Sequence, residues 1–221
     1  MLFLSEHFKC FSVVRLPAGA TADALGQNLK QYGPTLRFRL GSFAEARRFL
    51  SPLKSFTTRF LIVDCRGWSL ITSDMRNESR LVDALLVSRV AHCQAISVCF
   101  QGKRREFAVI KSGQKLRQVE STSDGDRWYF RQEGTPQAFE EVSEYTRSPR
   151  SERLSVEAVK RYFIRFTGLE LPLVANRSFT TAVGLERSTK DLLVPVARFK
   201  TLDDLPCGDQ LHESNGDEHL R

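Results

Sequence analysis

The sequence lacks the short motifs by which metal sites and many enzymes are found. Its 221 residues contain no Cys-x-x-Cys pair and no His-x-x-x-His pair, the spacings that commonly bind zinc. No glycine-rich loop precedes a predicted helix, so the backbone cradle that binds phosphate groups is also missing. These absences exclude the common zinc and nucleotide sites, and we expect a protein without cofactor, metal or catalytic residues.

Histidine, the usual general base near neutral pH, occurs only four times. His92 ends a predicted helix, where the helix dipole favours a positive charge. An enzyme is therefore only our third hypothesis, and it requires a pocket that gathers two or more ionisable residues. The residues that could do so are His92, Cys93, Asp64, Asp74 and Glu140.

Cysteines are few and long hydrophobic runs are absent. The five cysteines are odd in number and scattered, which favours reduced and mostly buried thiols over a disulfide framework. No apolar run approaches the ~18 residues that a membrane-spanning helix needs. The apolar run at residues 1–4 is short and lacks a basic leader, which argues against a secretory signal. We expect a cytoplasmic protein without a membrane span.

Charge is unevenly distributed along the chain. Residues 203–221 hold six acids and one base, a net charge of −5, which leaves +12 for residues 1–202 out of the total of +7. A basic body can attract nucleic acid, an anionic membrane surface or an acidic protein, or it can be an ordinary solvated surface. We expect residues 1–202 to form one domain and residues 203–221 to form a flexible acidic tail.

The stretch from residue 59 to residue 100 organises the chain. Its apolar runs, turn residues and alternation predict, in order, a strand, a tight turn, a strand, a helix and a strand. These elements are expected at residues 60–63, 64–67, 68–72, about 77–91 and 95–100.

The N-terminal part predicts two more strands, at residues 6–16 and 36–40, and two more helices. Thr21 is the expected N-cap of the first helix, which runs to residue 32. The second helix starts after Ser42, which forms a capping-box match with Glu45, and ends at residue 51.

The C-terminal part predicts a three-stranded meander, a short helix, a polar loop, a capped helix and two edge strands. They are expected at residues 105–111, 115–121 and 127–131, then 139–145, 147–153, 155–167, 171–174 and 192–196. The whole pattern predicts an α+β fold, with a mostly antiparallel sheet, helices packed on one face and a single domain.

Three groups of side chains are candidates for contact with a partner. Arg104 and Arg105 follow a predicted turn, and Tyr129 stands on the face of its strand that also carries Arg127 and Arg131. Interleaved aromatic and basic residues are typical of nucleic-acid platforms, so a basic nucleic-acid-associated module is our second hypothesis. The third group is the acidic cluster Glu140, Glu141 and Glu144.

Scattered motifs over residues 58–168 carry a resemblance to a known class of protein. They are Gly67-Trp68-Ser69, the leucines Leu81, Leu85 and Leu86, Trp128-x-Phe130, Gly134-x-Pro136-x-x-Phe139-Glu140, Tyr145 and Arg153-Leu154. In this order they resemble uncharacterised bacterial immunity-type proteins encoded beside antibacterial toxins of polymorphic or type VI secretion systems. The resemblance implies a cytoplasmic, non-enzymatic protein that binds and blocks one cognate toxin.

The leading hypothesis is therefore an immunity-type binding protein that occludes its partner over ~800 Å² per side. Immunity proteins against nucleases are often acidic, and the basic body departs from that pattern. The expected contact residues are Arg104, Arg105, Tyr129, Glu140, Glu141 and Glu144.

Overall fold

A computed structural model describes most of the chain from residue 2 to residue 188. The described residues are 2–3, 9–32, 35–51, 57–73, 80–171, 174–175 and 182–188. The predicted tail 203–221, the predicted strand 192–196, Asp74 and the first residues of the predicted central helix lie outside them.

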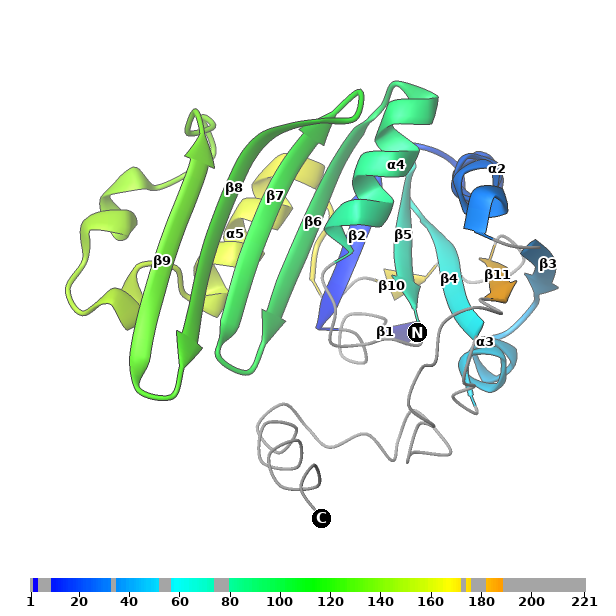
Figure 1. The fold of residues 1–221 in the computed structure, drawn as a ribbon, viewed down its shortest axis with the longest axis horizontal. Coiled ribbons are helices and arrows are strands. Elements are labelled where there is room, and N and C mark those ends of the chain that lie inside the picture. The colour runs from blue at the N-terminus through cyan, green and yellow to red at the C-terminus, as the bar shows by residue number, and fades with distance from the viewer. Residues whose placement is uncertain are drawn as a thin grey trace, which may run out of the picture.

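One nine-stranded antiparallel sheet dominates the structure and runs across it in the order β3-β11-β4-β5-β2-β6-β7-β8-β9 (Figure 1). Its strands are β2 Cys10–Val14, β3 Thr35–Leu40, β4 Thr57–Cys65, β5 Trp68–Ser73, β6 Gln94–Gln101, β7 Arg104–Lys111, β8 Gln114–Asp124, β9 Arg127–Gly134 and β11 Ala182–Ser188. Two short strands, β1 Leu2–Phe3 and β10 Val174–Ala175, pair separately. The prediction of a mostly antiparallel α+β fold is confirmed.

Four α-helices and three short 3-10 helices complete the described part of the chain. The α-helices are α2 Ala18–Leu29, α3 Phe43–Leu50, α4 Leu81–Ala91 and α5 Val156–Thr167. The 3-10 helices are η1 Lys30–Tyr32, η2 Val142–Thr146 and η3 Arg150–Glu152. The short helix expected at residues 139–145 is thus a later 3-10 helix, and the predicted loop 147–153 contains one.

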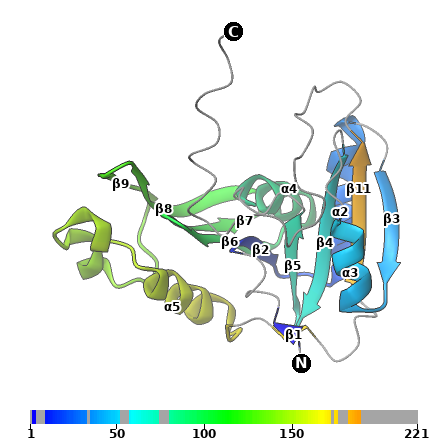
Figure 2. The same ribbon diagram turned by 90° about the horizontal axis from the view of Figure 1, so that it is seen from below.

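Helices lie on both faces of the sheet, so the prediction that they pack on one face is wrong. Side chains of β4 alternate between two cores, with Leu61 and Val63 in one and Phe60 and Ile62 in the other. The first core also contains residues of α3 and α5, and the second contains residues of α2 and α4. Figure 2 shows α4 and α5 on opposite sides of the strands.

Strand β11 lies between β3 and β4, far from both in sequence. Gly184 is opposite Phe38 of β3 and Leu61 of β4. We did not predict this strand from the sequence. It completes the sheet at the end where β3 is the outer strand.

The N-terminus of α5 is capped by a nearby residue in the sequence, whereas that of α2 is capped by a residue of another element. Ser155 accepts a hydrogen bond from the Ala158 N–H (3.0 Å) and begins α5 as predicted. Thr21 is not a cap, because it lies inside α2; the carboxylate of Asp64 accepts a bond from the Ala18 N–H instead (2.6 Å). A cap supplied by the β4–β5 hairpin therefore joins the start of α2 to the sheet.

The C-terminal end of α4 is fixed to the β7–β8 turn. The Ser88 hydroxyl donates to the Cys93 carbonyl (2.6 Å) and accepts from the Gly113 N–H (3.1 Å). Gly113 has a φ of +76°, and a Cβ there would lie 2.5 Å from the Cβ of Arg89. Only glycine allows this close approach between helix and turn.

The prediction that all cysteines are reduced is wrong for one pair of them. Cys10 and Cys99 are directly opposite each other on β2 and β6 and form a disulfide, because the antiparallel register brings these two side chains together. Cys65 is buried and free, and Cys93 is half-buried and free. Among the described residues, no helix has both the length and the apolar character to cross a membrane.

Candidate partner-binding surface

The largest fully buried side chain of the described structure is a charged one, Arg117 of β8. It belongs to the face of the sheet that α5 covers, two residues before the core residue Val119 on the same strand. Its side chain is 1% exposed, and that of its ion-pair partner Glu140 is 0% exposed. Burial of a charge requires a counter-charge and hydrogen bonds to every donor.

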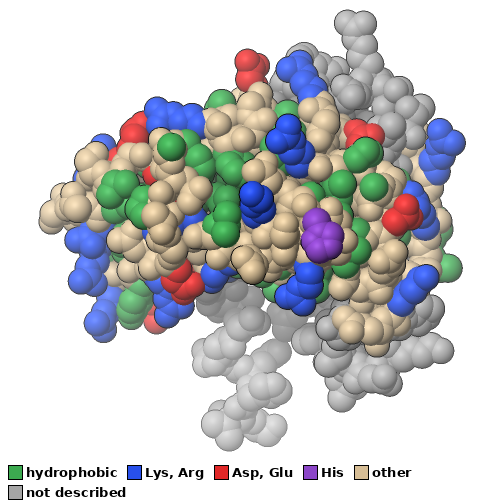
Figure 3. Space-filling view, turned by 90° about the horizontal axis from the view of Figure 1, so that it is seen from above, with side chains coloured by type: hydrophobic (Ala, Val, Ile, Leu, Met, Phe, Trp, Pro, Cys, Tyr) green, Lys and Arg blue, Asp and Glu red, His purple; other side chains and the backbone are tan. Residues whose placement is uncertain are grey.

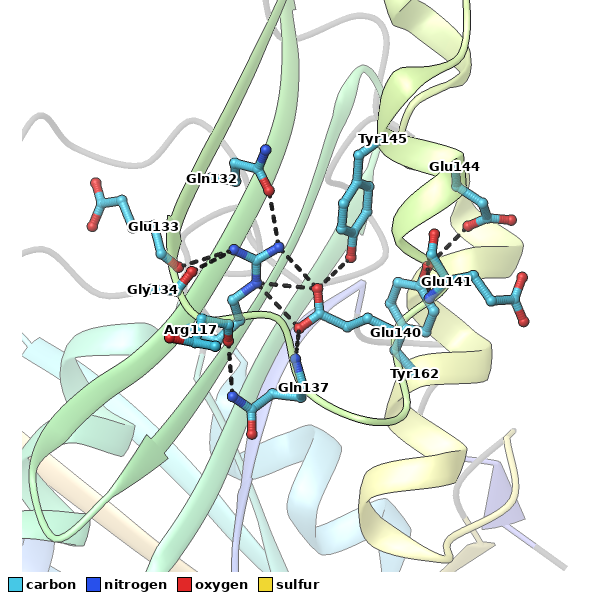
Figure 4. Close-up of polar contacts among 11 residues, drawn as sticks. Arg117, Gln132, Glu133, Gly134, Gln137, Glu140, Glu141, Glu144, Tyr145 and Tyr162 are labelled. Carbon is cyan, nitrogen blue, oxygen red and sulfur yellow. Dashed lines mark hydrogen bonds and ion pairs between the residues drawn. The ribbon is translucent and has the colours of Figure 1, made fainter.

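Arg117 has these partners on both sides (Figure 4). Its Nε and Nη2 donate to the carboxylate of Glu140 over 2.9–3.1 Å. Nη1 donates to the carbonyl of Gly134 (2.8 Å) and Nη2 to the side chain of Gln132 (3.0 Å). The guanidinium therefore joins the end of β9 to the segment that follows it.

Gly134 is required where β9 ends beside Arg117. Its φ is +76°, and a Cβ at this position would lie 2.0 Å from the carbonyl oxygen of Leu116. A larger residue would push β9 away from β8 and move the carbonyl that Arg117 binds.

Glu140 accepts bonds from other groups as well. The Gln137 N–H and the Tyr145 hydroxyl each donate to its carboxylate, both at 2.7 Å. Burial raises the pKa of Tyr145 well above its ordinary value, and the hydrogen bond to the negatively charged Glu140 carboxylate raises it further. Glu140 is thus enclosed by donors, and the expectation that it lies at the surface is wrong, because Arg117 holds it inside.

Glu144 is also buried. Its carboxylate accepts from Arg161 (2.6 Å) and from the hydroxyl of Tyr162 (3.0 Å), both on α5. Its side chain is 6% exposed, so the expectation of a free surface acid is wrong here too. Glu141 is more exposed and pairs with Arg161 and Arg165. The hydrogen bond from Arg165 is the main cause that holds the pKa of Glu141 below its ordinary value. The positive charge of Arg161 acts in the same direction.

The opposite face of β7, β8 and β9 presents a different set of side chains, which we call the open face. In the described part of the chain no helix covers the β8–β9 part of this face, and α4 lies over the neighbouring strands β2 and β6 (Figures 1 and 2). Thr122 of β8 is opposite Tyr129 of β9. Arg105 of β7 is opposite Ser121, so the preceding residue Arg104 is level with Thr122 and lies with it on the other face of the sheet. Arg104, Thr122 and Tyr129 therefore form one row across three strands, about 10 Å wide.

Charges of both signs surround this row. Arg104 binds Glu106 (2.8 Å) and Glu120 (3.3 Å), while Lys115 binds Glu133 (2.6 Å). The bases and acids of the open face and its turns balance at five each. They are Lys103, Arg104, Lys115, Arg127 and Arg131, and Glu106, Glu120, Asp124, Asp126 and Glu133.

Tyr129 is the most prominent apolar group on the open face. It is 42% exposed, and the guanidinium of Arg127 lies 5.3 Å from its ring centre. Arg105 belongs to the other face, as the strand alternation requires. There it lies 4.8 Å above the ring of Trp128 and donates to the Ser151 carbonyl (2.7 Å). The open face therefore brings together Arg104 and Tyr129 but not Arg105.

Among the residues that the structure describes, the candidates for catalysis lie in separate parts of the molecule. His92 is exposed at the left-handed C-cap of α4, and Asp64 is the cap of α2. Glu140 is bound to Arg117 on the other side of the sheet. No group of three or more potential metal ligands occurs among the described residues.

Sequence reasoning missed Arg117, which positions the whole β9–η2 region. A signal was present, because Arg117 is two residues from Val119 and must share its buried face. Comparison with known protein families, characterised proteins and solved structures finds no match to this chain.

Proposed function

We propose that this chain is a non-catalytic binding protein of the immunity type, which occludes a cognate antibacterial toxin in the cytoplasm. The observation that carries the proposal is the exposed Tyr129 with Arg104 in the same row of the open face. Tyrosine and arginine are, with tryptophan, the residues enriched at the energetic centres of protein interfaces.

The strands behind this row support the proposal because they present its side chains in a fixed arrangement. On the reverse side, Arg117 joins β8 to the end of β9, and Arg105 joins β7 to the carbonyl of Ser151. A surface that is already ordered loses less conformational freedom when it binds, so more of the contact energy appears as affinity.

The acids are arranged for structure, which favours binding over catalysis. Glu140 and Glu144 accept hydrogen bonds from arginine and tyrosine side chains that are themselves packed against the sheet or α5. A general base needs a free lone pair directed at a substrate. These carboxylates direct theirs at neighbouring side chains.

Nucleic-acid binding is the second candidate, and the stacking of Arg127 on the exposed Tyr129 favours it. The balance of charges speaks against it, because five acids on the open face would repel phosphates. On a different side of the molecule, seen from above in Figure 3, basic side chains also lie among acidic, apolar and neutral ones and form no single large basic patch. A protein partner with charges of both signs fits this surface better.

The test uses the product of the neighbouring gene, expressed in a bacterial host with and without this chain. We expect growth arrest by that product alone, rescue by this chain, and a complex measurable by calorimetry. Tyr129→Ala should weaken binding at least about 30-fold and abolish rescue, which is the loss expected of a central contact. Ile164→Ala, at a residue of similar exposure on α5, should leave both unchanged.

Two results would refute the proposal. One is a host that grows equally well with and without this chain while the neighbouring product is made. The other is tight binding of single-stranded nucleic acid that falls steeply with salt and is lost in Tyr129→Ala, which would establish the second candidate instead.

A further inference from the structure

Strand β2 is the narrowest joint of the nine-stranded sheet. It has four strands on each side and, with five residues, it is the shortest of the nine (Figure 1). All five residues pair with β6, whereas the register with β5 comprises only residues 12–14. In the pairing that the structure describes, Cys10 and Phe11 at the start of β2 are therefore held by β6 alone.

The disulfide between Cys10 and Cys99 lies at this singly paired end. The Phe100 N–H donates to the carbonyl of Lys9 (2.9 Å), so the cysteines form the next pair of the ladder, which has no hydrogen bond of its own. Side chains come closest in such a pair, and the two Cα atoms are 4.1 Å apart. The disulfide thus fastens the start of β2 where only one neighbouring strand holds it.

Phe11 connects this end of β2 to helix α5. Its side chain is buried and packs edge to face against Phe100 of β6 and Phe163 of α5, with ring centres 6.0 Å and 5.6 Å apart. If the start of β2 left β6, Phe11 would be withdrawn from the core beneath α5. The loss of apolar burial opposes this opening, and the disulfide prevents it while the bond is intact.

We propose that the Cys10–Cys99 bond is a redox-controlled clamp on the start of β2. While the bond is intact, Cys10 and Phe11 stay in the sheet. When the bond is reduced, they leave β6 more often and Phe11 leaves its place beneath α5. The clamp would act with or without a toxin partner, so it does not depend on the proposed function.

The reductant is a low-molecular-weight thiol such as glutathione. Its thiolate attacks one sulfur of the disulfide and forms a mixed disulfide, while the other cysteine sulfur leaves with the bonding electron pair and takes up a proton. A second glutathione thiolate attacks the glutathione sulfur of the mixed disulfide. Glutathione disulfide and the second protein thiol result, and two electrons have passed from the two glutathione thiols to the protein.

The compartment decides which form predominates. Glutathione keeps thiols reduced in the cytosol, so in the cytoplasm that we propose for this chain the clamp opens, and it closes when an oxidant raises the share of glutathione disulfide. Both cysteines are 1% exposed, so a thiol reaches the bond only when the start of β2 opens. Because the bond joins residues 89 positions apart in sequence, its loss also favours the unfolded chain.

Amide hydrogen exchange, followed by NMR on the full chain with and without dithiothreitol, tests the clamp at both ends of the β2–β6 ladder. The Phe100 N–H donates to Lys9 beside the disulfide, and the Arg15 N–H donates to Gln94 at the other end, both over 2.9 Å. We expect reduction to accelerate exchange of the Phe100 amide at least about tenfold and that of the Arg15 amide less than about threefold. Equal acceleration at both ends would overturn the proposal, because the bond would then only stabilise the fold as a whole.

Cysteine variants separate the clamp from other effects of the reductant. Cys99→Ala should show the fast Phe100 exchange with and without dithiothreitol. Cys93→Ala, which removes a half-buried free thiol just before β6, should keep the full response. A response that is lost in Cys93→Ala or retained in Cys99→Ala would overturn the proposal. The comparison of the oxidised and reduced natural chain needs no variant, so it decides even if Cys99→Ala fails to fold.

Equilibration in glutathione buffers shows whether the bond switches. After equilibration the free thiols are alkylated in denaturant and located by mass spectrometry. We expect Cys10 and Cys99 to be unmodified in glutathione disulfide and both to be modified in excess reduced glutathione. A bond that persists in excess reduced glutathione, or thiols that stay free in glutathione disulfide, would overturn the proposal.

Discussion

The buried pair of Arg117 and Glu140 allows the sharpest test of the structure. Glu140→Gln keeps the shape of the side chain and removes its charge. The carboxylate accepts from the Arg117 guanidinium, the Gln137 N–H and the Tyr145 hydroxyl. A glutamine has a single acceptor oxygen, and its amide would place N–H groups against at least one of these donors.

The expected loss is large because neither group can reach water. The two side chains are 1% and 0% exposed, so Arg117 would remain charged and buried without a counter-charge. Removal of one partner of a buried ion pair costs about 3–5 kcal/mol. That is a large part of the ~5–15 kcal/mol by which a folded domain is stable.

Urea unfolding followed by the fluorescence of Trp68 and Trp128 measures this loss. Arg117→Met should cost a similar amount, and the double variant should cost less than the two single losses together, by about 2–3 kcal/mol. The surface variant Glu133→Gln removes the pair with Lys115, where Glu133 is 47% exposed and water screens the charges, and should cost far less than Glu140→Gln. A loss below about 1 kcal/mol for Glu140→Gln, or strict additivity in the double variant, would refute the reasoning.

Three further predictions concern other side chains. Burial, followed by the neighbouring carboxylates, raises the pKa of Tyr145 and of Tyr162; unfolded tyrosines ionise near pH ~10. The folded state therefore keeps protons that the unfolded state loses, and the urea midpoint should fall as pH rises above about 10, less so in Tyr145→Phe. Burial raises the pKa of the Cys65 thiol to about 12, so iodoacetamide at pH ~8 should label Cys65 only after unfolding, as mass spectrometry would show. Asp64→Ala removes the cap of Ala18 and should cost about 0.5–2 kcal/mol in the same urea assay.

The parts of the fold that depend on local chemistry could be predicted from the sequence. Turn residues with alternating side chains placed the meander of β7, β8 and β9 to within a few residues. Ser155 and Gly168 gave both ends of α5, because a hydroxyl cap and a left-handed glycine act within one turn of helix.

The division of the helices between two faces was not predicted, although the sequence contained a signal for it. Residues 60–63 are a continuous apolar run, and all four are buried. A strand with one wet face would alternate, so a continuous run indicates that both faces are covered. Strand β11 gave a weaker signal, since only Val183 and Leu185 alternate, and its partners are more than 120 residues away.

The candidate surface was predicted in part. Strand alternation correctly placed Tyr129 with Arg127 and away from Trp128, because period two is a property of the strand itself. The burial of Glu140 and Glu144 could not be read from their own neighbours in sequence. It depends on Arg117 and Arg161, which the fold brings to them from other elements.

The position of β11 has a consequence for synthesis of the protein on the ribosome. Strand β4 emerges early, yet the neighbour that covers its outer edge ends at Ser188. Until that late segment has left the exit tunnel, the outer edge of β4 lacks its partner strand. Its backbone groups and apolar side chains are then exposed, and a chaperone could bind them. A polypeptide that stops at residue 181 should accordingly collect in the insoluble fraction, whereas one that stops at residue 202 should not.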